Sequence, residues 1–345
     1  MIHLAITKSH LICANWEKED KQNFLNFVSY QPFNEPLIGV DRSESDILSD
    51  INNALQVIRN DIGFEGQSVY VSIPDEFCNS SSVALDFEMT VIDAWEFAKW
   101  TINQRWPRNG EFEFFGRYFN SYESKVFAIR VSRAFADPLK IAIQELGCQV
   151  EWMGTESSAF FGLSPKVGAS IFYPNKTGYR YFSYSQDSFD LGYAKFEKGS
   201  WVIISQNGSI SINDVFDRKI LILGNLSSKR KNQFGGKKIT QVSALSGFVI
   251  KGNIFSKNLK QKDLERLYVL TPIANGSPRG SAINFLDSPG LHSYKVNSST
   301  LEESPLINKD TKELRIKKSR SKKSTNPMVY FFFFVIAVLA LLKLI

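Results

Sequence analysis

The chain has 345 residues, 43% of them hydrophobic, with 41 basic and 35 acidic side chains. This length and composition predict a folded protein of about two structural units and exclude a collagen-like, wholly disordered or disulfide-stapled chain. The net charge of +6 is local, because residues 309–326 hold eight Lys or Arg against two acids, and Lys343 adds one more cation, which leaves −1 for the rest. This near-neutral remainder argues against a general nucleic-acid-binding surface.

The first 82 residues predict three strands, a helix and a strand. Apolar runs place the strands at 2–6, 11–16, 24–28 and 69–73. Ser43 or Ser45 is placed to cap a helix over residues 46–59. The expected buried face of that helix carries Ile47, Leu48, Ile51, Leu55 and Ile58.

Residues 83–150 have a pattern of their own. A helix from Thr90 to Arg105 is expected, followed by antiparallel strands at 111–119 and 125–131. Asp137 and Pro138 predict the start of a second helix, and Gly147 its end. The expected faces of these helices are Val91, Trp95, Ala98 and Ile102 for the first, and Leu139, Ala142, Ile143 and Leu146 for the second. A strand at 150–153 and a short helix from Thr155 toward Phe161 complete the block.

A second series of strands follows Gly168. We expect a meander at 179–184, 189–196 and 201–205, then a strand at 219–223 that ends at Gly224. Further strands are expected near Val242 and Phe248, and a short helix at 261–270. A three-strand meander followed by a helix and a strand thus occurs twice, once from Ile2 and again from Tyr179. This duplication is typical of actin-like, Hsp70-like and sugar-kinase-like domains.

The C-terminal sequence predicts a membrane anchor behind a flexible basic linker at 287–326. Met328–Leu342 contains fifteen apolar residues without a charge, which as a helix reach most of the way across a hydrocarbon core of about 30 Å. The alternative is a buried core helix, which four consecutive Phe residues without a polar face disfavour. The basic residues before this segment predict that residues 1–326 are cytoplasmic. Residues 1–20 lack the pattern of a signal peptide.

Short catalytic and metal-binding motifs are absent from the sequence. It contains no Cys-X-X-Cys, HExxH, P-loop or GxSxG motif, and His3, His10 and His292 have no metal-ligand spacing to the cysteines. Cys13, Cys78 and Cys148 are far apart, which favours reduced thiols over a disulfide framework. We therefore expect no metal site.

Three segments carry a resemblance to a known family. They are Val69–Trp106, which begins VYVSIPDEF, then Lys125–Phe161, and Pro272–Leu286, with the sequence PIANGSPRGSAINFL. In this order they resemble the PilM family, the actin-like cytoplasmic platform of type IV pili, and the related cytoplasmic part of GspL in type II secretion. The resemblance covers most of residues 1–290. It implies an α/β protein with a duplicated actin-like (ribonuclease H-like) fold and an inserted small α+β domain, to which the apolar tail adds a transmembrane helix.

The resemblance also implies the position of a nucleotide site, at which this chain lacks the Asp and Gly residues of the family's phosphate turns. Actin-like ATPases use an Asp-X-Gly turn between the first two strands of each half, where Gly lets the backbone approach phosphate and Asp organises metal and water. Alignment places Ala5 and Thr7 at the first turn, Ser183 and Ser185 at the second, and Gly224-Asn225 at the adenosine-side Gly-Gly. We expect no hydrolysis and no catalytic or metal residue. Residual ATP binding stays open at a vestigial site of Thr7, Ser9, Ser183, Ser185 and Gly224. Asp187 and Asp190 lie nearby, and we expect them to be solvated turn carboxylates.

The tetrad Ile283-Asn284-Phe285-Leu286 resembles an Ile-Asn-Leu-Leu-type peptide, with which a separate membrane partner of the pilus platform begins. Because this chain carries both parts, we expect the tetrad to dock in cis near residues 83–150. The alternative is that the four residues finish the last helix of the fold.

Five parts follow from these expectations: 1–82, the first actin-like half; 83–152, the insert; 153–286, the rest of the first half and the second half; 287–326, the linker; and 327–345, the transmembrane helix. The expected function is that of a scaffold without catalysis in a type IV pilus or type II secretion platform, single-pass in the bacterial inner membrane. Expected partners are the inner-membrane proteins of that platform, the lipid bilayer and a second copy of the chain, but not nucleic acid. An active actin-like ATPase or small-molecule kinase is the alternative, and an unrelated membrane-tethered adaptor is a third interpretation.

Overall fold

We describe the protein from a computed structural model. It describes residues 1–20, 22–37, 42–84, 89–107, 109–119, 125–159, 168–175, 177–184, 189–207, 211–224, 226–242, 247–250, 267, 270 and 283–293. The chain divides into two compact units, 1–314 and 315–345, and all of the described residues belong to the first. The expected transmembrane helix lies outside them, and none of the helices within them is long and apolar enough to cross a membrane.

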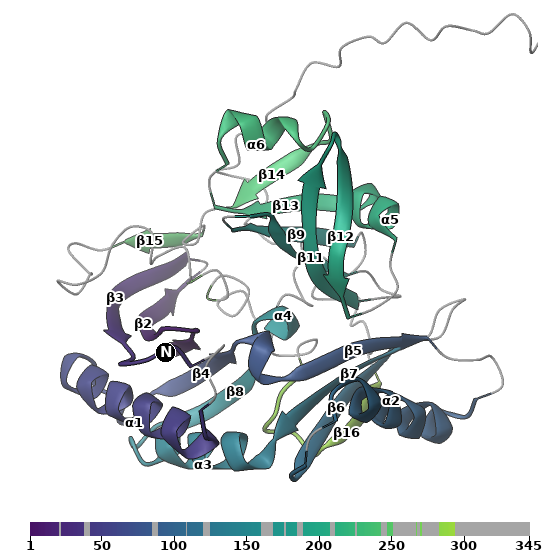
Figure 1. The fold of residues 1–345 in the computed structure, drawn as a ribbon. Coiled ribbons are helices and arrows are strands. Elements are labelled where there is room, and N and C mark those ends of the chain that lie inside the picture. The colour runs from purple at the N-terminus through teal and green to yellow at the C-terminus, as the bar shows by residue number, and fades with distance from the viewer. Residues whose placement is uncertain are drawn as a thin grey trace, which may run out of the picture. The chain divides into compact units, whose positions relative to one another are not determined.

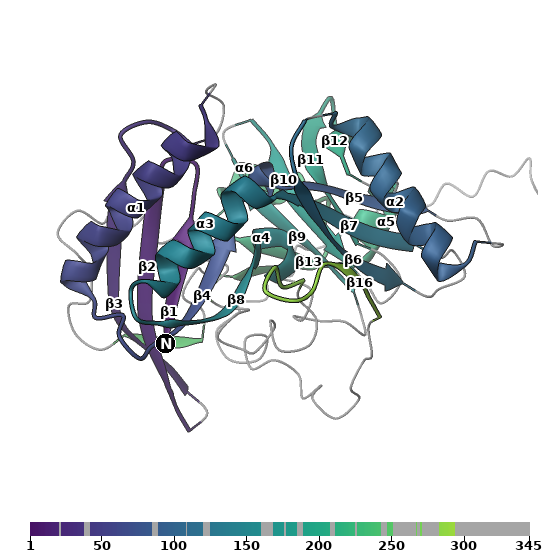
Figure 2. The ribbon, with the colours of Figure 1, turned by 90° about the horizontal axis from the view of Figure 1, so that it is seen from below.

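One six-stranded sheet is built mainly from the N-terminal part of the chain (Figure 1). In sheet order its strands are Phe248–Ile250 (β15), Gln22–Pro32 (β3), His10–Glu19 (β2), Ile2–Ile6 (β1), Ser68–Ile73 (β4) and Gln149–Thr155 (β8). β1, β2 and β3 pair antiparallel, whereas β1, β4 and β8 run parallel. Helices Glu44–Asp61 (α1) and Arg133–Gln144 (α3) lie side by side on one face of this sheet (Figure 2).

A second six-stranded sheet repeats this arrangement. Its strands in sheet order are Ser200–Gln206 (β12), Phe189–Glu197 (β11), Tyr179–Tyr184 (β10), Ala169–Pro174 (β9), Lys219–Leu223 (β13) and Ile239–Val242 (β14). β9, β10 and β11 pair antiparallel, and β9, β13 and β14 run parallel. The order β11-β10-β9-β13-β14 therefore matches β3-β2-β1-β4-β8, which confirms the duplicated α/β fold. The described residues of this half include the short helices Ile212–Asp217 (α5) and Ser228–Asn232 (α6), and most of the expected helix at 261–270 lies outside them.

A third, four-stranded sheet forms the insert. Its strands in sheet order are Gly290–Ser293 (β16), Phe112–Phe119 (β6), Lys125–Ser132 (β7) and Asn79–Ala84 (β5), and Val91–Arg105 (α2) packs on it. The expected antiparallel pair is confirmed as β6 and β7. The insert begins before residue 83, because β5 starts at Asn79, and β8 at its expected far end belongs to the first sheet. The linker cannot begin at residue 287, because β16 pairs with β6.

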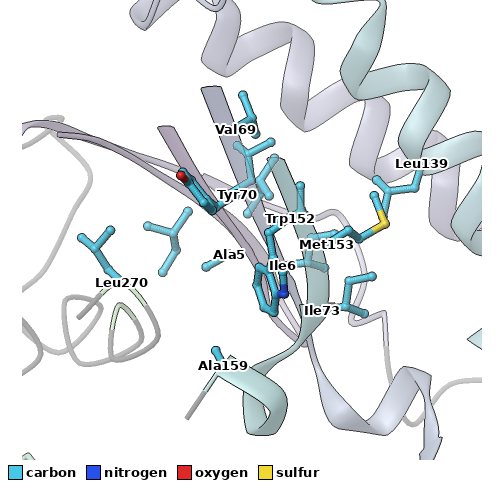
Figure 3. Packing of buried hydrophobic residues seen from close by; sticks show 14 of the residues in the cluster. Ala5, Ile6, Val69, Tyr70, Ile73, Leu139, Trp152, Met153, Ala159 and Leu270 are labelled. Atoms are coloured by element: carbon cyan, nitrogen blue, oxygen red, sulfur yellow. The ribbon is translucent and has the colours of Figure 1, made fainter. Parts of the chain in front are cut away.

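The largest hydrophobic core joins parts of all three sheets. Figure 3 shows Met153 of β8 pointing toward Leu139 of α3, whereas Trp152 lies on the other side of the first sheet, toward Ala159. A second core packs Phe172, Tyr179 and Tyr181 of the second sheet against α5 and the residues that flank α6. Each sheet thus buries alternate side chains of its strands on its two faces.

The expected N-caps of α1 and α2 are confirmed, and the expected buried faces are confirmed with one correction. Ser43 caps α1 and Thr90 caps α2, each accepting a hydrogen bond at 3.2 Å from the N–H three residues on. The five expected apolar positions of α1 are buried. In α2, Val91 is 55% exposed, so the expected place of this residue on the buried face is wrong, and Ala94 lies there instead.

The start of α3 differs from the expected one. Asp137 is not its cap, and Pro138 lies inside the helix, which begins at Arg133. Phe135 and Ala136 in the added turn are buried, and this burial outweighs the hydrogen bond that Pro138 cannot donate. The end is as expected, since Gly147 adopts a φ of +80° and donates to the carbonyl of Gln144. The described residues of the first half also include two short helices, Asp75–Phe77 (η1) and Glu156–Ala159 (α4).

Candidate functional site

The turn after β1, where a phosphate loop is expected, is closed by its own first side chain. The N–H of Thr7 donates to the carbonyl of His10 at 3.0 Å. The hydroxyl oxygen of Thr7 accepts from the N–H groups of Ser9 at 3.4 Å and His10 at 3.2 Å. Three N–H groups of the turn are therefore bonded within it, in the manner of a serine/threonine turn.

The turn between β9 and β10 is closed in the same way. The N–H of Asn175 donates to the carbonyl of Gly178 at 3.0 Å. The amide oxygen of Asn175 accepts from the N–H groups of Thr177 at 2.9 Å and Gly178 at 2.8 Å. Because each turn follows the first strand of its half and uses the same three bond positions, Asn175 is the counterpart of Thr7.

The strand order corrects the expected second turn. Sequence reasoning missed β9 and took β10 as the first strand, so its placement of Ser183 at this turn is wrong. Ser183 lies inside β10, fully buried, where its hydroxyl is 2.7 Å from that of Ser170 and accepts from Arg218 at 3.1 Å. Ser185 and Asp187 lie outside the described residues. Asp190 is not a solvated turn carboxylate, because it is buried in β11 opposite Ser183.

Gly224 follows β13 and also makes contacts within the sheet. It adopts a φ of +90°, which favours glycine. Its N–H donates to the carbonyl of Val242 at 2.9 Å, and its carbonyl accepts from the Gln241 side chain at 3.2 Å. Backbone cradling of phosphate needs N–H groups that face a ligand. At both turns and at Gly224, N–H groups in these positions are bonded to the chain itself.

A cluster of charged residues that sequence reasoning did not single out lies between the first two sheets. The guanidinium of Arg180, in β10, contacts Asp75 of η1 at 2.8 Å, Glu76 at 3.2 Å and Glu156 of α4 at 3.5 Å. Asp75 also accepts from the N–H of Ser157 at 3.3 Å and from its hydroxyl. The segment VYVSIPDEF contains Asp75 and Glu76, but its pattern gives no sign of a partner 105 residues away.

Burial and pairing act in opposite directions on this cluster. Burial raises the pKa of Asp75 above its ordinary value, and Arg180 and Ser157 offset only part of that rise. Burial works to lower the pKa of Arg180, but the three carboxylates raise it, and the balance lies above its ordinary value. Burial therefore outweighs the ion pair for Asp75, whereas the ion pair outweighs burial for Arg180. We assign a cation to Arg180, since the ordinary guanidinium pKa lies far above neutrality, and the ionised form of Asp75 then depends on this cation.

The tetrad at 283–286 lies along the outer edge of β8, the last strand of the first sheet as described. The N–H of Phe285 donates to the carbonyl of Met153 at 2.7 Å, and the amide oxygen of Asn284 accepts from the N–H of Met153 at 3.0 Å. The indole of Trp152 donates to the carbonyl of Ile283 at 3.2 Å. Asn284 thus extends the hydrogen bonding of the sheet edge with its side chain.

Side chains of the tetrad also enter the core. Ile283 and Phe285 are buried, and the Phe285 ring lies 5.0 Å from that of Phe115 in β6, within the insert. The segment then continues into β16, which pairs with the same strand. Residues 283–286 form no helix, so the alternative that they finish the last helix of the fold is wrong.

Within the described ranges, no group of three or more His, Cys, Asp or Glu side chains is placed to hold a metal ion. The described residues do bring together two other features, a charged contact between two sheets and a sheet edge with a peptide segment on it.

Comparison with known proteins finds neither a matching family model nor a matching curated protein. Solved structures do resemble the chain. A PilM–PilN type IV pilus biogenesis complex has a TM-score of 0.47 at 11% identity, over 81% of this chain and 97% of that one. The cytoplasmic domain of EpsL, an inner-membrane component of the type II secretion system of Vibrio cholerae, has a TM-score of 0.41 at 7% identity, over 83% and 98%.

A third structure, a Bacteroides thetaiotaomicron protein with an actin-like ATPase fold and unknown function, has a TM-score of 0.36 at 8% identity, over 77% and 94%. The likeness is one of fold. Because all three TM-scores lie below 0.5, we derive the function from the sequence and contacts of this chain.

Proposed function

We propose that this chain is a membrane-anchored cytoplasmic scaffold of a type IV pilus assembly or type II secretion platform, without catalysis of its own. The observation that carries the proposal is the docked segment 283–293. It attaches the last described residues to β8 and β6, and in the sequence the proposed basic linker and the apolar run 328–342 follow it. A scaffold that links a membrane segment to a cytoplasmic body needs such an attachment.

The two closed turns support a role without hydrolysis. ATP hydrolysis on an actin-like fold needs N–H groups for the phosphates and a carboxylate that positions the metal. At the turn that begins with Thr7 and at the turn that begins with Asn175, a side chain of the chain takes those N–H groups. We infer that the residues Thr7, Ser9 and Gly224 are relics of a nucleotide site.

The remaining parts of the proposal rest on sequence. The apolar tail is the proposed single-pass anchor in a bacterial inner membrane, with residues 1–326 in the cytoplasm. The inner-membrane proteins of the platform, the bilayer and a second copy of the chain are the proposed partners. The tetrad, whose sequence resembles a partner peptide of the pilus platform, is proposed to occupy the edge of β8 in cis.

Deleting the gene in its host and assaying both surface pili and secreted proteins tests the role. We expect one of the two to be lost, and to be restored by the full chain but not by a chain without residues 327–345. Normal pili and normal secretion in the deletion strain would refute the proposal. Extraction of the full chain from membranes by carbonate or high salt would refute the anchor alone.

The rival function is an active actin-like ATPase or small-molecule kinase. The purified full chain in detergent should show no magnesium-dependent ATP turnover above a protein-free control. Turnover that disappears when Asp187 or Asp190 is replaced by Asn would overturn the scaffold proposal in favour of the ATPase.

A further inference from the structure

Arg180 connects two sheets at the edge where α/β proteins bind ligands. Ligands of such sheets lie outside the carboxyl ends of the parallel strands. Asp75 and Glu76 follow the carboxyl end of β4, and Glu156 follows that of β8. The cation that meets these three carboxylates belongs to the chain itself, because Arg180 reaches them from β10, next to the turn that begins with Asn175.

The contact is built as a binding site for a guanidinium. The side chain of Asp75 is only 4% exposed, and Ser157 holds it through its N–H and hydroxyl groups. Two nitrogens of Arg180 contact different carboxylates, and its guanidinium lies 5.1 Å from the centre of the Phe182 ring. A planar cation with several donors suits this arrangement better than an ammonium does.

We propose that Asp75, Glu76 and Glu156 form a guanidinium-binding site, that Arg180 fills it in cis, and that this internal ligand holds the two sheets together without a nucleotide. Removing one member of a buried ion pair leaves the other charge buried and unpaired. This lowers the stability of the fold far more than replacing both members by apolar residues does. The site therefore strongly favours the one arrangement in which Arg180 reaches Asp75. It goes beyond the scaffold role, because it names a polar contact that, beside the shared hydrophobic core, favours one arrangement of the two sheets.

The test compares Arg180→Ala with wild type in the full chain, purified in detergent, by hydrogen exchange. We expect amides of residues 75–77 and 179–182 to exchange about 100-fold faster in the variant, as the loss of a buried pair implies. Arg133→Ala is the matched control. Arg133 also contacts three carboxylates, Glu111, Glu113 and Asp137, at 3.4–3.6 Å, but its side chain is 50% exposed. We expect this control to change exchange by less than about fivefold.

A second readout separates a binding site from a merely structural residue. Methylguanidinium at a concentration far below denaturing levels should restore slow exchange in Arg180→Ala and leave Arg133→Ala unchanged. Unchanged exchange in Arg180→Ala, or rescue that is absent or equal in the two variants, would overturn the proposal.

If Arg180→Ala does not fold, Arg180→Lys replaces it. This variant keeps the charge but loses the planar fork, and we expect faster exchange at the same two segments. Wild-type exchange rates in Arg180→Lys would overturn the proposal. ATP turnover by the wild type would refute the scaffold function and leave this inference intact, so the two failures are distinguishable.

Discussion

Asn284 is the residue on which the docking of the tetrad can be tested most directly. Its amide oxygen accepts from the N–H of Met153 at 3.0 Å and from the N–H of Leu286 at 3.2 Å. Asn284→Ala removes both bonds, and also the longer bond of 3.5 Å from its Nδ2 to the carbonyl of Glu151. At about 0.5–1.5 kcal/mol for each bond, the expected loss of unfolding free energy is about 1–3 kcal/mol.

That loss is smaller than what the neighbouring side chains supply. Ile283 and Phe285 are buried, and each contributes roughly 1.5–3 kcal/mol when desolvated. The segment should therefore stay docked in most molecules of Asn284→Ala, while its population of detached molecules rises. Asn284→Asp keeps an acceptor for the N–H groups of Met153 and Leu286 and loses only the longer bond to the carbonyl of Glu151, so we expect a smaller loss than in Asn284→Ala.

Urea denaturation of the full chain in detergent measures the loss, and limited proteolysis between residues 283 and 293 reports the detachment. A loss below about 0.5 kcal/mol with unchanged proteolysis would show that the hydrogen bonds of Asn284 do not hold the segment. An equal loss in Asn284→Asp would show that the acceptor is not the reason.

Three other predictions concern Gly154, the pair Phe285 and Leu286, and His3. Gly154→Ala should lower the unfolding free energy, measured by urea denaturation, by about 1–3 kcal/mol, because the new Cβ would lie 2.6 Å from the carbonyl oxygen of Ile283. Gly63→Ala is the control and should change it little, because no atom lies within 4 Å of the new Cβ. Equal losses in the two variants would contradict the close packing at Gly154. Phe285→Ser with Leu286→Ser should vacate the β8 edge, so that a labelled peptide with the tetrad sequence binds the variant and not the wild type; a variant that keeps its stability but binds no peptide would end the docking idea. Burial lowers the pKa of His3 from 6.5 to about 3, which favours the neutral ring in the folded state. The unfolding free energy should therefore fall by about 1.4 kcal/mol for each pH unit below 6.5 on account of His3. In His3→Gln this dependence should be absent between pH 6 and 4, and the same dependence in the variant would refute the assignment.

Elements whose signals are local were predictable from the sequence. Helix α1 needed only a cap at Ser43 and apolar residues at helical spacing, and both were visible in the chain. The antiparallel pairing of β6 with β7 followed from two apolar runs with a short connection. The start of α3 was missed because the Pro138 signal was given more weight than the apolar residues Phe135 and Ala136 before it.

Features that depend on contacts far apart in the chain were not predictable in the same way. Strand β9 lies between Gly168 and Asn175 as a short apolar run, and leaving it out moved the expected second turn one strand too far. The Arg180 cluster could not have been predicted, because nothing at residue 75 or residue 180 alone indicates an ion pair. The tetrad was noticed only through its resemblance to a partner peptide, and its contacts with Met153 and Phe115 come from the structure.

The two turns show why the loss of phosphate-binding residues is better judged from hydrogen bonds than from the absence of Gly or Asp. Thr7 and Asn175 differ in chemistry, yet each accepts from the N–H groups two and three residues on, and each donates its own N–H to the carbonyl three residues on. Short side chains with an oxygen stabilise a turn in this way, and they consume the donors that would otherwise be offered to an anion. The second turn even keeps a glycine, Gly178, whose N–H is bonded to Asn175. In both turns of this chain the first side chain therefore takes N–H groups that a phosphate would need, whether or not the turn keeps a glycine.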